Sequence, residues 1–194
     1  MVMTVKKTKD SRTKEYIMHR IADVRGGVSV VTSELGGDFL AESTPLYFSG
    51  GKWHALKIAR VAEKTTSTSV KVEKTHNLKV GDVLLMNVGE KAASVSKIDT
   101  SAKGYDTITL SAALGTINAG AVLLEAAEVQ TTSGAARKHT VDALVGTGTP
   151  IEPNSNVITD AWLIGVINDV NFPEAALPKG FVKVFGHGVN MLMD

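Results

Sequence analysis

The chain has no cysteine among its 194 residues. That absence excludes a disulfide scaffold, a zinc site built from thiolates and a cysteine nucleophile. Aromatic residues make up only 5% of the sequence, whereas 18 residues are glycine. This mix favours thin sheets joined by many turns. The stability of the protein must therefore come from apolar packing or from association with other subunits.

Two further features are missing, an excess of charge of one sign and a long apolar run. The chain carries 21 basic and 20 acidic residues, for a net charge of +1. Binding to nucleic acid needs a basic excess that neutralises phosphates, so no nucleic-acid partner is expected. The longest apolar stretches, 83–86 and 121–124, are far shorter than the roughly 20 residues of a membrane-spanning helix. We therefore expect no membrane partner.

Short runs of alternating apolar and polar residues fill the region 44–124, and tight turns separate them. One run turns at Gly50 and Gly51, a second at Gly81 and Asp82, and a third covers 105–110. Such runs are typical of half-buried strands. The sequence therefore predicts a mainly β chain with little helix. We expect a small β-sandwich or barrel domain that carries an inserted second, barrel-like β domain.

Composition divides the chain into three parts. Residues 1–25 form a basic N-terminal arm, in which Lys6, Lys7, Lys9, Arg12 and Lys14 lie close together. The polar tracts 63–69 and 128–140 have the character of exposed loop tips, where insertions are tolerated. We therefore predict a base domain from residues 26–62 plus 126–194, with residues 63–125 inserted as a small β domain.

Several segments carry more specific expectations. Residues 16–24 fit a strand or a short helix, because apolar residues recur there at helical spacing. Residues 53–62 are predicted to form one returning strand, and the nearly continuous apolar run 161–167 a central strand buried on both faces. Residues 173–178 should make one helical turn that begins at a proline, and residues 181–186 a final strand.

No set of polar residues has the spacing of a catalytic, cofactor or metal site. The histidines are dispersed and are expected to be surface or loop residues: His19, His54, His76, His139 and His187. The aspartates that border strands are expected to close turns: Asp82, Asp99, Asp106, Asp160 and Asp169. The glycine pair at 146 and 148 predicts a turn rather than a phosphate loop, because Pro150 and Ile151 stand where a helix should begin. We assign no catalytic, cofactor-binding or metal-binding residue and expect no cofactor.

Two tryptophans and the C-terminal residues leave alternatives open. Trp53 and Trp162 can be core anchors in hairpins or residues of a protein interface. Together with Tyr47 and Tyr105 they could also offer stacking faces to a carbohydrate. The apolar run 191–193 is expected to pack on a neighbouring subunit rather than to remain in water.

The order of these motifs resembles a known family. The relevant motifs are Thr44-Pro-Leu-Tyr-Phe-Ser-Gly-Gly-Lys-Trp, His76-Asn-Leu-Lys-Val-Gly-Asp-Val-Leu, Tyr105-Asp-Thr-Ile-Thr-Leu, Ala119-Gly-Ala-Val-Leu, Asp142-Ala-Leu-Val-Gly, and Ala161-Trp-Leu-Ile-Gly-Val-Ile. The set is similar to head fibre and capsid head decoration proteins of tailed phages, including versions carried by prophages of Bacteroides-type bacteria. The resemblance extends over residues 26–190.

The resemblance implies a non-enzymatic structural protein on the outside of a virion, made in the cytoplasm of the bacterial host. Its partners would be the major capsid protein and further copies of itself, with a trimer favoured. The basic arm would dock as an added strand on the capsid. No shaft repeat or heptad region is present, which favours decoration over a long fibre. The alternatives are a carbohydrate- or host-surface-binding β-module and, with less support, a hydrolytic enzyme, which would need a deep pocket with converging polar groups.

Overall fold

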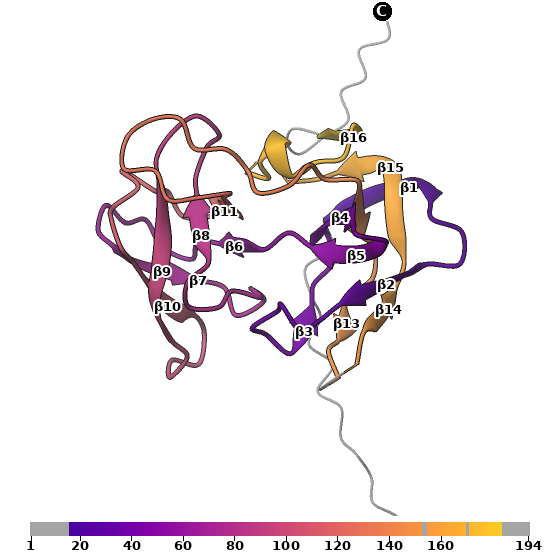
Figure 1. Cartoon of the computed structure of the whole chain (residues 1–194), viewed down its shortest axis with the longest axis horizontal. Coiled ribbons are helices and arrows are strands. Elements are labelled where there is room, and N and C mark those ends of the chain that lie inside the picture. Colours follow the sequence, from indigo (N-terminus) through magenta and orange to yellow (C-terminus); the bar gives the residue numbers. More distant parts are fainter. Residues whose placement is uncertain (1–15, 153–154, 170, 184–194) are drawn as a thin grey trace, which may run out of the picture.

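The alternating runs of the sequence form two β-sheets that lie side by side (Figure 1). A computed structural model of the chain describes residues 16–152, 155–169 and 171–183. Helical structure within these residues is limited to the single turn η1 (Glu174–Ala176). The prediction of a mainly β chain with little helix is confirmed. So is the predicted helical turn after Pro173.

The first sheet has eight strands in the described part of the chain. Its order is β1-β15-β12-β4-β5-β2-β14, and β16 pairs beside β15. The strands are β1 (Ile17–Asp23), β2 (Val28–Val31), β4 (Pro45–Ser49), β5 (Lys52–Ala55), β12 (Ala143–Val145), β14 (Val157–Thr159), β15 (Ala161–Ile167) and β16 (Gly180–Lys183). Most neighbours are antiparallel, but β2 pairs with β5 and β15 with β16 in parallel.

The second sheet has six strands in the order β6-β11-β8-β9-β10-β7, counted over the same described residues. They are β6 (Ile58–Arg60), β7 (Ser69–Val72), β8 (Val83–Leu85), β9 (Ala92–Asp99), β10 (Asp106–Leu110) and β11 (Val122–Glu125). A bridge between Val61 and Val72 brings the two ends together, so the sheet curls as a half barrel. A separate small ladder joins β3 (Phe39–Leu40) to β13 (Thr149–Pro150).

Three buried apolar clusters hold the two sheets. One cluster fills the first sheet around Val30, Leu46 and Val145. A second fills the curled sheet and is built by alternation, as in β10, where Ile108 and Leu110 point inward. The third contains residues from both sheets and from the 126–141 segment. Because both sheets bury side chains in this shared cluster, neither keeps its full core without the other.

Two glycines allow the loop after β2 in the first sheet to meet the loop between β7 and β8 of the second. A β-carbon on Gly36, in the turn after β2, would lie 2.1 Å from the carbonyl oxygen of Leu78. One on Gly37 would lie 2.6 Å from the side-chain oxygen of Asn77. The Gly36 amide donates to the Asn77 carbonyl at 2.9 Å. The Gly36–Gly37 pair, which the sequence marks only as a strand break, is therefore a contact between the sheets.

The structure refines several expectations about single segments. Residues 17–23, at the end of the predicted arm, form strand β1 and not a helix; residues 1–15 lie outside the described residues. The predicted single strand 53–62 is wrong, because it divides into β5, which pairs with β4, and β6, which pairs with β11 in the second sheet. Strand β15 lies between neighbours as predicted, but its Ile164 side chain is 41% exposed, so the strand is not buried on both faces.

The boundaries of the inserted domain stay a prediction. What the strands show is that the chain leaves the first sheet after β5, builds all of the second sheet, and returns after β11. The predicted hairpin at residues 49–52 is present: Ser49 pairs with Lys52, and Gly50 and Gly51 have φ values of 56° and 77°. Both values lie in the left-handed region that such a two-residue turn requires.

Candidate functional site

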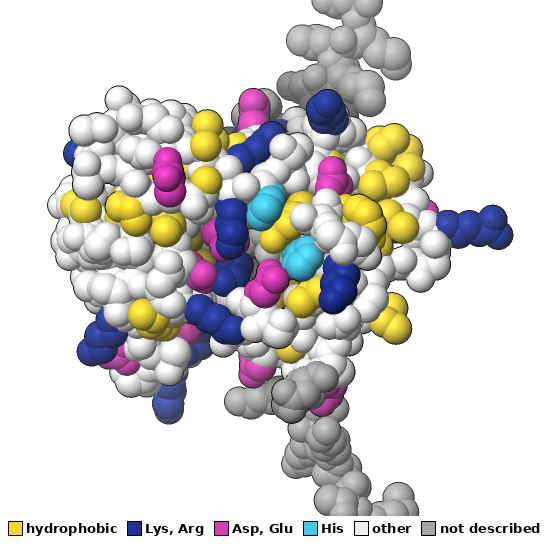
Figure 2. Space-filling model, viewed as in Figure 1, with side chains coloured by type: hydrophobic (Ala, Val, Ile, Leu, Met, Phe, Trp, Pro, Cys, Tyr) yellow, Lys and Arg dark blue, Asp and Glu magenta, His cyan; other side chains and the backbone are white. Residues whose placement is uncertain are grey.

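An exposed apolar surface lies over the three adjacent strands β1, β15 and β16. Met18 and Ile21 on β1, Ile164 on β15 and Val182 on β16 are all exposed. Ile164 is paired with Ala22 on one side and Gly180 on the other, so small neighbours leave it uncovered. Figure 2 shows hydrophobic side chains gathered at this side of the molecule, at the upper right. We call these four residues the β1–β15–β16 surface.

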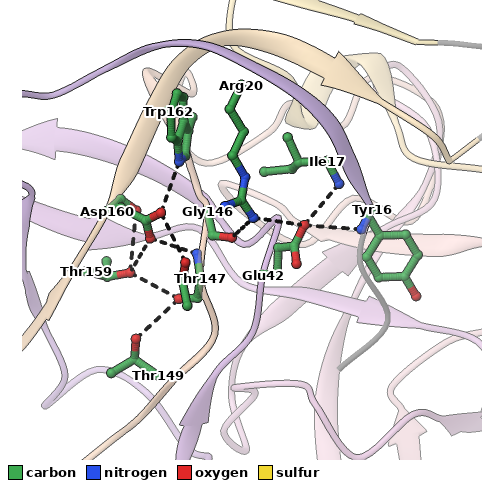
Figure 3. Close-up of polar contacts among 10 residues, drawn as sticks. All are labelled: Tyr16, Ile17, Arg20, Glu42, Gly146, Thr147, Thr149, Thr159, Asp160 and Trp162. Atoms are coloured by element: carbon green, nitrogen blue, oxygen red, sulfur yellow. Dashed lines mark hydrogen bonds and ion pairs between the residues drawn. The ribbon is translucent and has the colours of Figure 1, made fainter. Parts of the chain in front are cut away.

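Strand β1 is fastened at its start by the buried carboxylate of Glu42 (Figure 3). One carboxylate oxygen accepts the amide hydrogens of Tyr16 at 3.2 Å and Ile17 at 3.0 Å. Arg20 lies 3.9 Å from the same oxygen and donates to the Gly146 carbonyl at 2.6 Å. Ser43, the next residue after Glu42, has a φ of 62°, which is uncommon for a residue other than glycine. A side chain and a locally strained turn therefore set the position of β1.

A second polar cluster holds the turn that precedes β13 against β15. Asp160 accepts from the Thr147 amide at 2.7 Å, the Thr147 hydroxyl at 3.1 Å and the Trp162 indole at 3.0 Å (Figure 3). Burial opposes the charged form of Asp160, but the hydrogen bonds from Trp162 and Thr147 outweigh it and lower the pKa of this carboxyl. A β-carbon on Gly146 would lie 2.1 Å from the Trp162 indole nitrogen. The turn and the tryptophan are thus packed as one unit.

The third cluster joins the first sheet to the 126–141 segment through stacked rings. Tyr47 on β4 stacks on His54 of β5, with ring centroids 5.2 Å apart, and on His139, 3.9 Å away. His54 also lies 3.3 Å from a carboxylate oxygen of Glu34. Burial, with Glu34 and Glu125 nearby, raises the pKa of Tyr47 to about 12. Burial and the adjacent Lys138 lower the pKa of His139. Tyr47 and His139 therefore both favour their neutral forms near pH 7.

Ion pairs continue this cluster toward the second sheet. Lys57 donates to both carboxylate oxygens of Asp82, at 2.7 and 2.8 Å. Glu125 on β11 accepts from the Lys57 amide at 3.1 Å and from the Lys138 ammonium at 2.7 Å. Burial disfavours the charged form of Lys138, but the bond to Glu125 and the attraction of this carboxylate outweigh it and raise the pKa. Figure 2 shows histidines and charges of both signs together between the two lobes.

Each charged group in these ion pairs has a partner of opposite charge within the protein. The ion pairs therefore hold the two sheets in position. Among residues 16–152, 155–169 and 171–183, no group of three or more His, Asp or Glu side chains could hold a metal ion. No helix in this part of the chain is long and apolar enough to cross a membrane.

The expectation that each histidine is a surface or loop residue is wrong for His54, which is half-buried on strand β5, whereas His76 and His139 lie in loops as expected. His54 and His139 are half-buried and stack on the same tyrosine ring. His76 is buried and lies 3.2 Å from Asp106. His19 is exposed on β1, as expected, and His187 lies outside the described residues. The stacked rings come from positions 47, 54 and 139, so no local sequence pattern could predict the stack.

The aspartates divide in the same way. Asp82, Asp99 and Asp169 accept amide hydrogens from Lys79, Ser101 and Asn171, two or three residues along the chain, and so close turns as predicted. Asp106 and Asp160 do not. Asp106 pairs with Lys74 at 2.5 Å and with His76, whereas Asp160 binds the distant turn at Thr147. The chain turns at the glycine pair 146 and 148 as predicted, and the short strand β13 (Thr149–Pro150) follows instead of a helix.

Both tryptophans pack in part against a core, and their role in a protein interface stays a prediction. Trp53 packs partly against the core of the first sheet, and Trp162 partly against the shared cluster. Of the other proposed stacking residues, Tyr47 is buried and Tyr105 lies beside the ammonium of Lys71, 4.7 Å from the ring centre. Phe48, which the sequence did not single out, is 55% exposed and contacts Trp53, with ring centroids 5.4 Å apart. Residues 191–193 lie outside the described residues.

No protein family, curated protein or solved structure matches this chain.

Proposed function

We propose that the protein is a non-enzymatic virion structural protein that decorates the outside of a phage capsid through protein–protein contacts. The observation that carries the proposal is the β1–β15–β16 surface. Large contiguous patches of exposed apolar side chains often mark a site of protein interaction. The motif order that resembles phage head decoration proteins supports the same function.

The partners of this surface would be the major capsid protein and other copies of the chain, with a trimer favoured. A mainly β protein on a symmetric shell can bind weakly at each contact and still remain attached, because many copies act together. The protein would be made in the bacterial host cytoplasm and would act on the capsid surface. The basic arm, residues 1–25, would add to the docking contact.

The test compares two exposed isoleucines at opposite edges of the first sheet. Ile21 on β1 is 66% exposed and belongs to the surface, whereas Ile158 on β14 is 74% exposed and does not. The wild type, Ile21→Lys and Ile158→Lys are each measured by light scattering and by co-sedimentation with capsids that lack the protein. Loss of one buried isoleucine contact costs about 1–2 kcal/mol, so Ile21→Lys should weaken binding roughly 5- to 30-fold.

Ile158→Lys should bind and assemble like the wild type. Equal urea midpoints of the two variants establish that the effect is not one of folding. A wild type that stays monomeric at all concentrations and does not sediment with capsids would refute the proposal. If Ile21→Lys and Ile158→Lys bind and assemble alike, the β1–β15–β16 surface is not the docking site and no longer supports the proposal.

A carbohydrate-binding β-module is the second candidate, and the pair of exposed Phe48 and half-buried Trp53 favours it. Exposed aromatic rings can stack on sugar faces, and Asp142, whose carboxylate accepts the Phe48 amide at 2.8 Å, supplies a polar group close by. A glycan array probed with wild type and Phe48→Ala tests it. Hits that disappear in the variant would support this candidate, and an array without hits would eliminate it.

A further inference from the structure

A groove runs between the 137–141 segment and the stretch from η1 to the end of β16. Its volume is about 510 Å³. Val141, Leu177, Pro178 and Phe181 give it apolar walls. Arg137, Lys179, Lys183 and Glu174 line it with charge. The groove lies beside Val182, one of the residues of the β1–β15–β16 surface, so the two features adjoin.

The groove follows the edge of a strand. Among the described strands, β16 pairs with β15 alone. Side chains of a strand alternate between its two faces, yet the consecutive residues 181, 182 and 183 all line the groove. That arrangement occurs where a groove runs along the strand edge, between the faces. The edge of a strand presents backbone N–H and C=O groups that can pair with another extended chain.

The charge of the groove is mainly positive, with three cations against one carboxylate. Arg137 donates to the Ala175 carbonyl at 2.7 Å, and Lys183 to the Phe172 carbonyl at 2.7 Å. These bonds fix the two cations and use only some of their N–H donors, since a guanidinium has five and an ammonium three. Lys179 is exposed at the turn into β16. The groove can therefore offer charge-assisted hydrogen bonds to carboxylates.

We propose that this groove takes an extended acidic segment of a partner protein, which adds to β16 as a further strand. Backbone pairing would supply affinity, and alternate side chains would meet the apolar wall and the cations. The basic arm of a second copy is a poor occupant, because its lysines would face Arg137, Lys179 and Lys183. The inference rests on the proposed function and extends it by naming the chemistry of the segment that the capsid partner would supply.

The experiment measures peptide binding to the full-length protein by fluorescence anisotropy. The probes are labelled octapeptides that alternate glutamate with valine, isoleucine, leucine or threonine. Matched peptides carry lysine in place of glutamate, and a third set is acidic but N-methylated at every residue, which removes the backbone donors of both strand edges. We expect saturable binding of acidic peptides, binding of lysine peptides weaker by about tenfold or more, and none of the N-methylated set, which cannot complete the strand ladder.

Two charge reversals localise the site. Lys179→Glu should weaken the binding of acidic peptides by about tenfold, because it places a negative charge like theirs in the groove. Lys103→Glu is the control, since Lys103 is exposed in the loop between β9 and β10 of the other sheet. Backbone NMR shifts on titration should cluster at residues 137–141 and 179–183.

Several results would overturn the proposal. They are the absence of binding by every acidic peptide, equal binding by the N-methylated set, and equal weakening by the two charge reversals. Binding that appears only after deletion of residues 184–194 would assign the groove to that segment. Capsid co-sedimentation without peptide binding would refute the groove and keep the proposed function. Peptide binding without capsid association would support the groove as a binding site and refute the proposed function.

Discussion

Replacement of Glu42 by alanine should loosen strand β1 and lower the stability of the whole protein. The Glu42 carboxylate is 5% exposed and accepts the amide hydrogens of Tyr16 and Ile17. A hydrogen bond to a charged group contributes about 1.5–3 kcal/mol, and each amide that loses its partner while buried is penalised further. This loss is partly offset because the variant no longer bears the free-energy cost of burying a carboxylate. The expected net loss in the free energy of unfolding is about 2–4 kcal/mol.

Two further glutamate variants make the prediction specific. Glu42→Gln keeps one side-chain oxygen as an acceptor, so it should lose roughly half as much. Glu34→Ala removes a glutamate that is 48% exposed and pairs with His54, and such a surface pair contributes about 0–1 kcal/mol. Urea unfolding followed by circular dichroism gives the three free energies at pH 7.

Hydrogen exchange locates the effect. Strand β1 is at the end of the sheet order, and its pairing with β15 has register shifts after Ile17, Arg20 and Ala22. An edge strand with irregular pairing should open before the rest of the sheet when its anchor is removed. Amides of β1 should therefore become the fastest-exchanging strand amides in Glu42→Ala, whereas amides of β8 to β10 should speed up by no more than the loss of global stability requires. A loss below about 0.5 kcal/mol, or uniform exchange across both sheets, would refute the argument that Glu42 fastens this strand.

Three further predictions concern the contact between the sheets. Gly36→Ala should destabilise the protein by about 2 kcal/mol or more in urea unfolding, because its β-carbon would meet a backbone oxygen at 2.1 Å, whereas Gly104→Ala, with open space around it, should change little. The free energy of unfolding should decrease as pH falls through 6.5. Burial, the largest effect, lowers the folded-state pKa of His76 and His139. The unfolded chain therefore binds protons that the folded chain does not. A variant with glutamine at both histidines should flatten this dependence between pH 5 and 7, and an unchanged slope would contradict the assignment. The Tyr47 phenol should ionise near pH 12 in absorbance titration, and stability should fall between pH 10 and 12, where only the unfolded chain loses that proton.

Local structure followed from local sequence wherever neighbouring residues supply the determinants. The β4–β5 turn could be predicted because Gly50 and Gly51 tolerate positive φ values that other residues resist. Strand β10 could be predicted because alternate positions are apolar, and those positions are buried. The turns at Asp99 and Asp169 use carboxylates that reach an amide two residues away. In each case the interacting groups lie within a few residues of each other.

Segments whose partners are distant could not be assigned in this way. Residues 17–23 have apolar residues at helical spacing, yet they form a strand because β15 and the carboxylate of Glu42 satisfy their backbone groups. The run 53–62 has the composition of one strand, but it divides because its second part pairs with β11. Strand β16 was expected, while its parallel pairing with β15, and hence the groove along its edge, was not.

The sequence by itself determined the mainly β character of the chain, its small amount of helix, its tight turns and the absence of any cysteine chemistry. Those properties depend on backbone preferences and on alternation over a few residues, which act within a single segment. Only the tertiary structure decided which strands are neighbours, and therefore that Tyr47 stacks on both His54 and His139 and that the exposed residues Met18, Ile21, Ile164 and Val182 lie on adjacent strands. Strand pairing is chosen by the burial of side chains from the whole chain at once. Contacts between distant segments, such as Arg20 with Gly146, 126 residues apart, therefore produce no pattern in the local sequence.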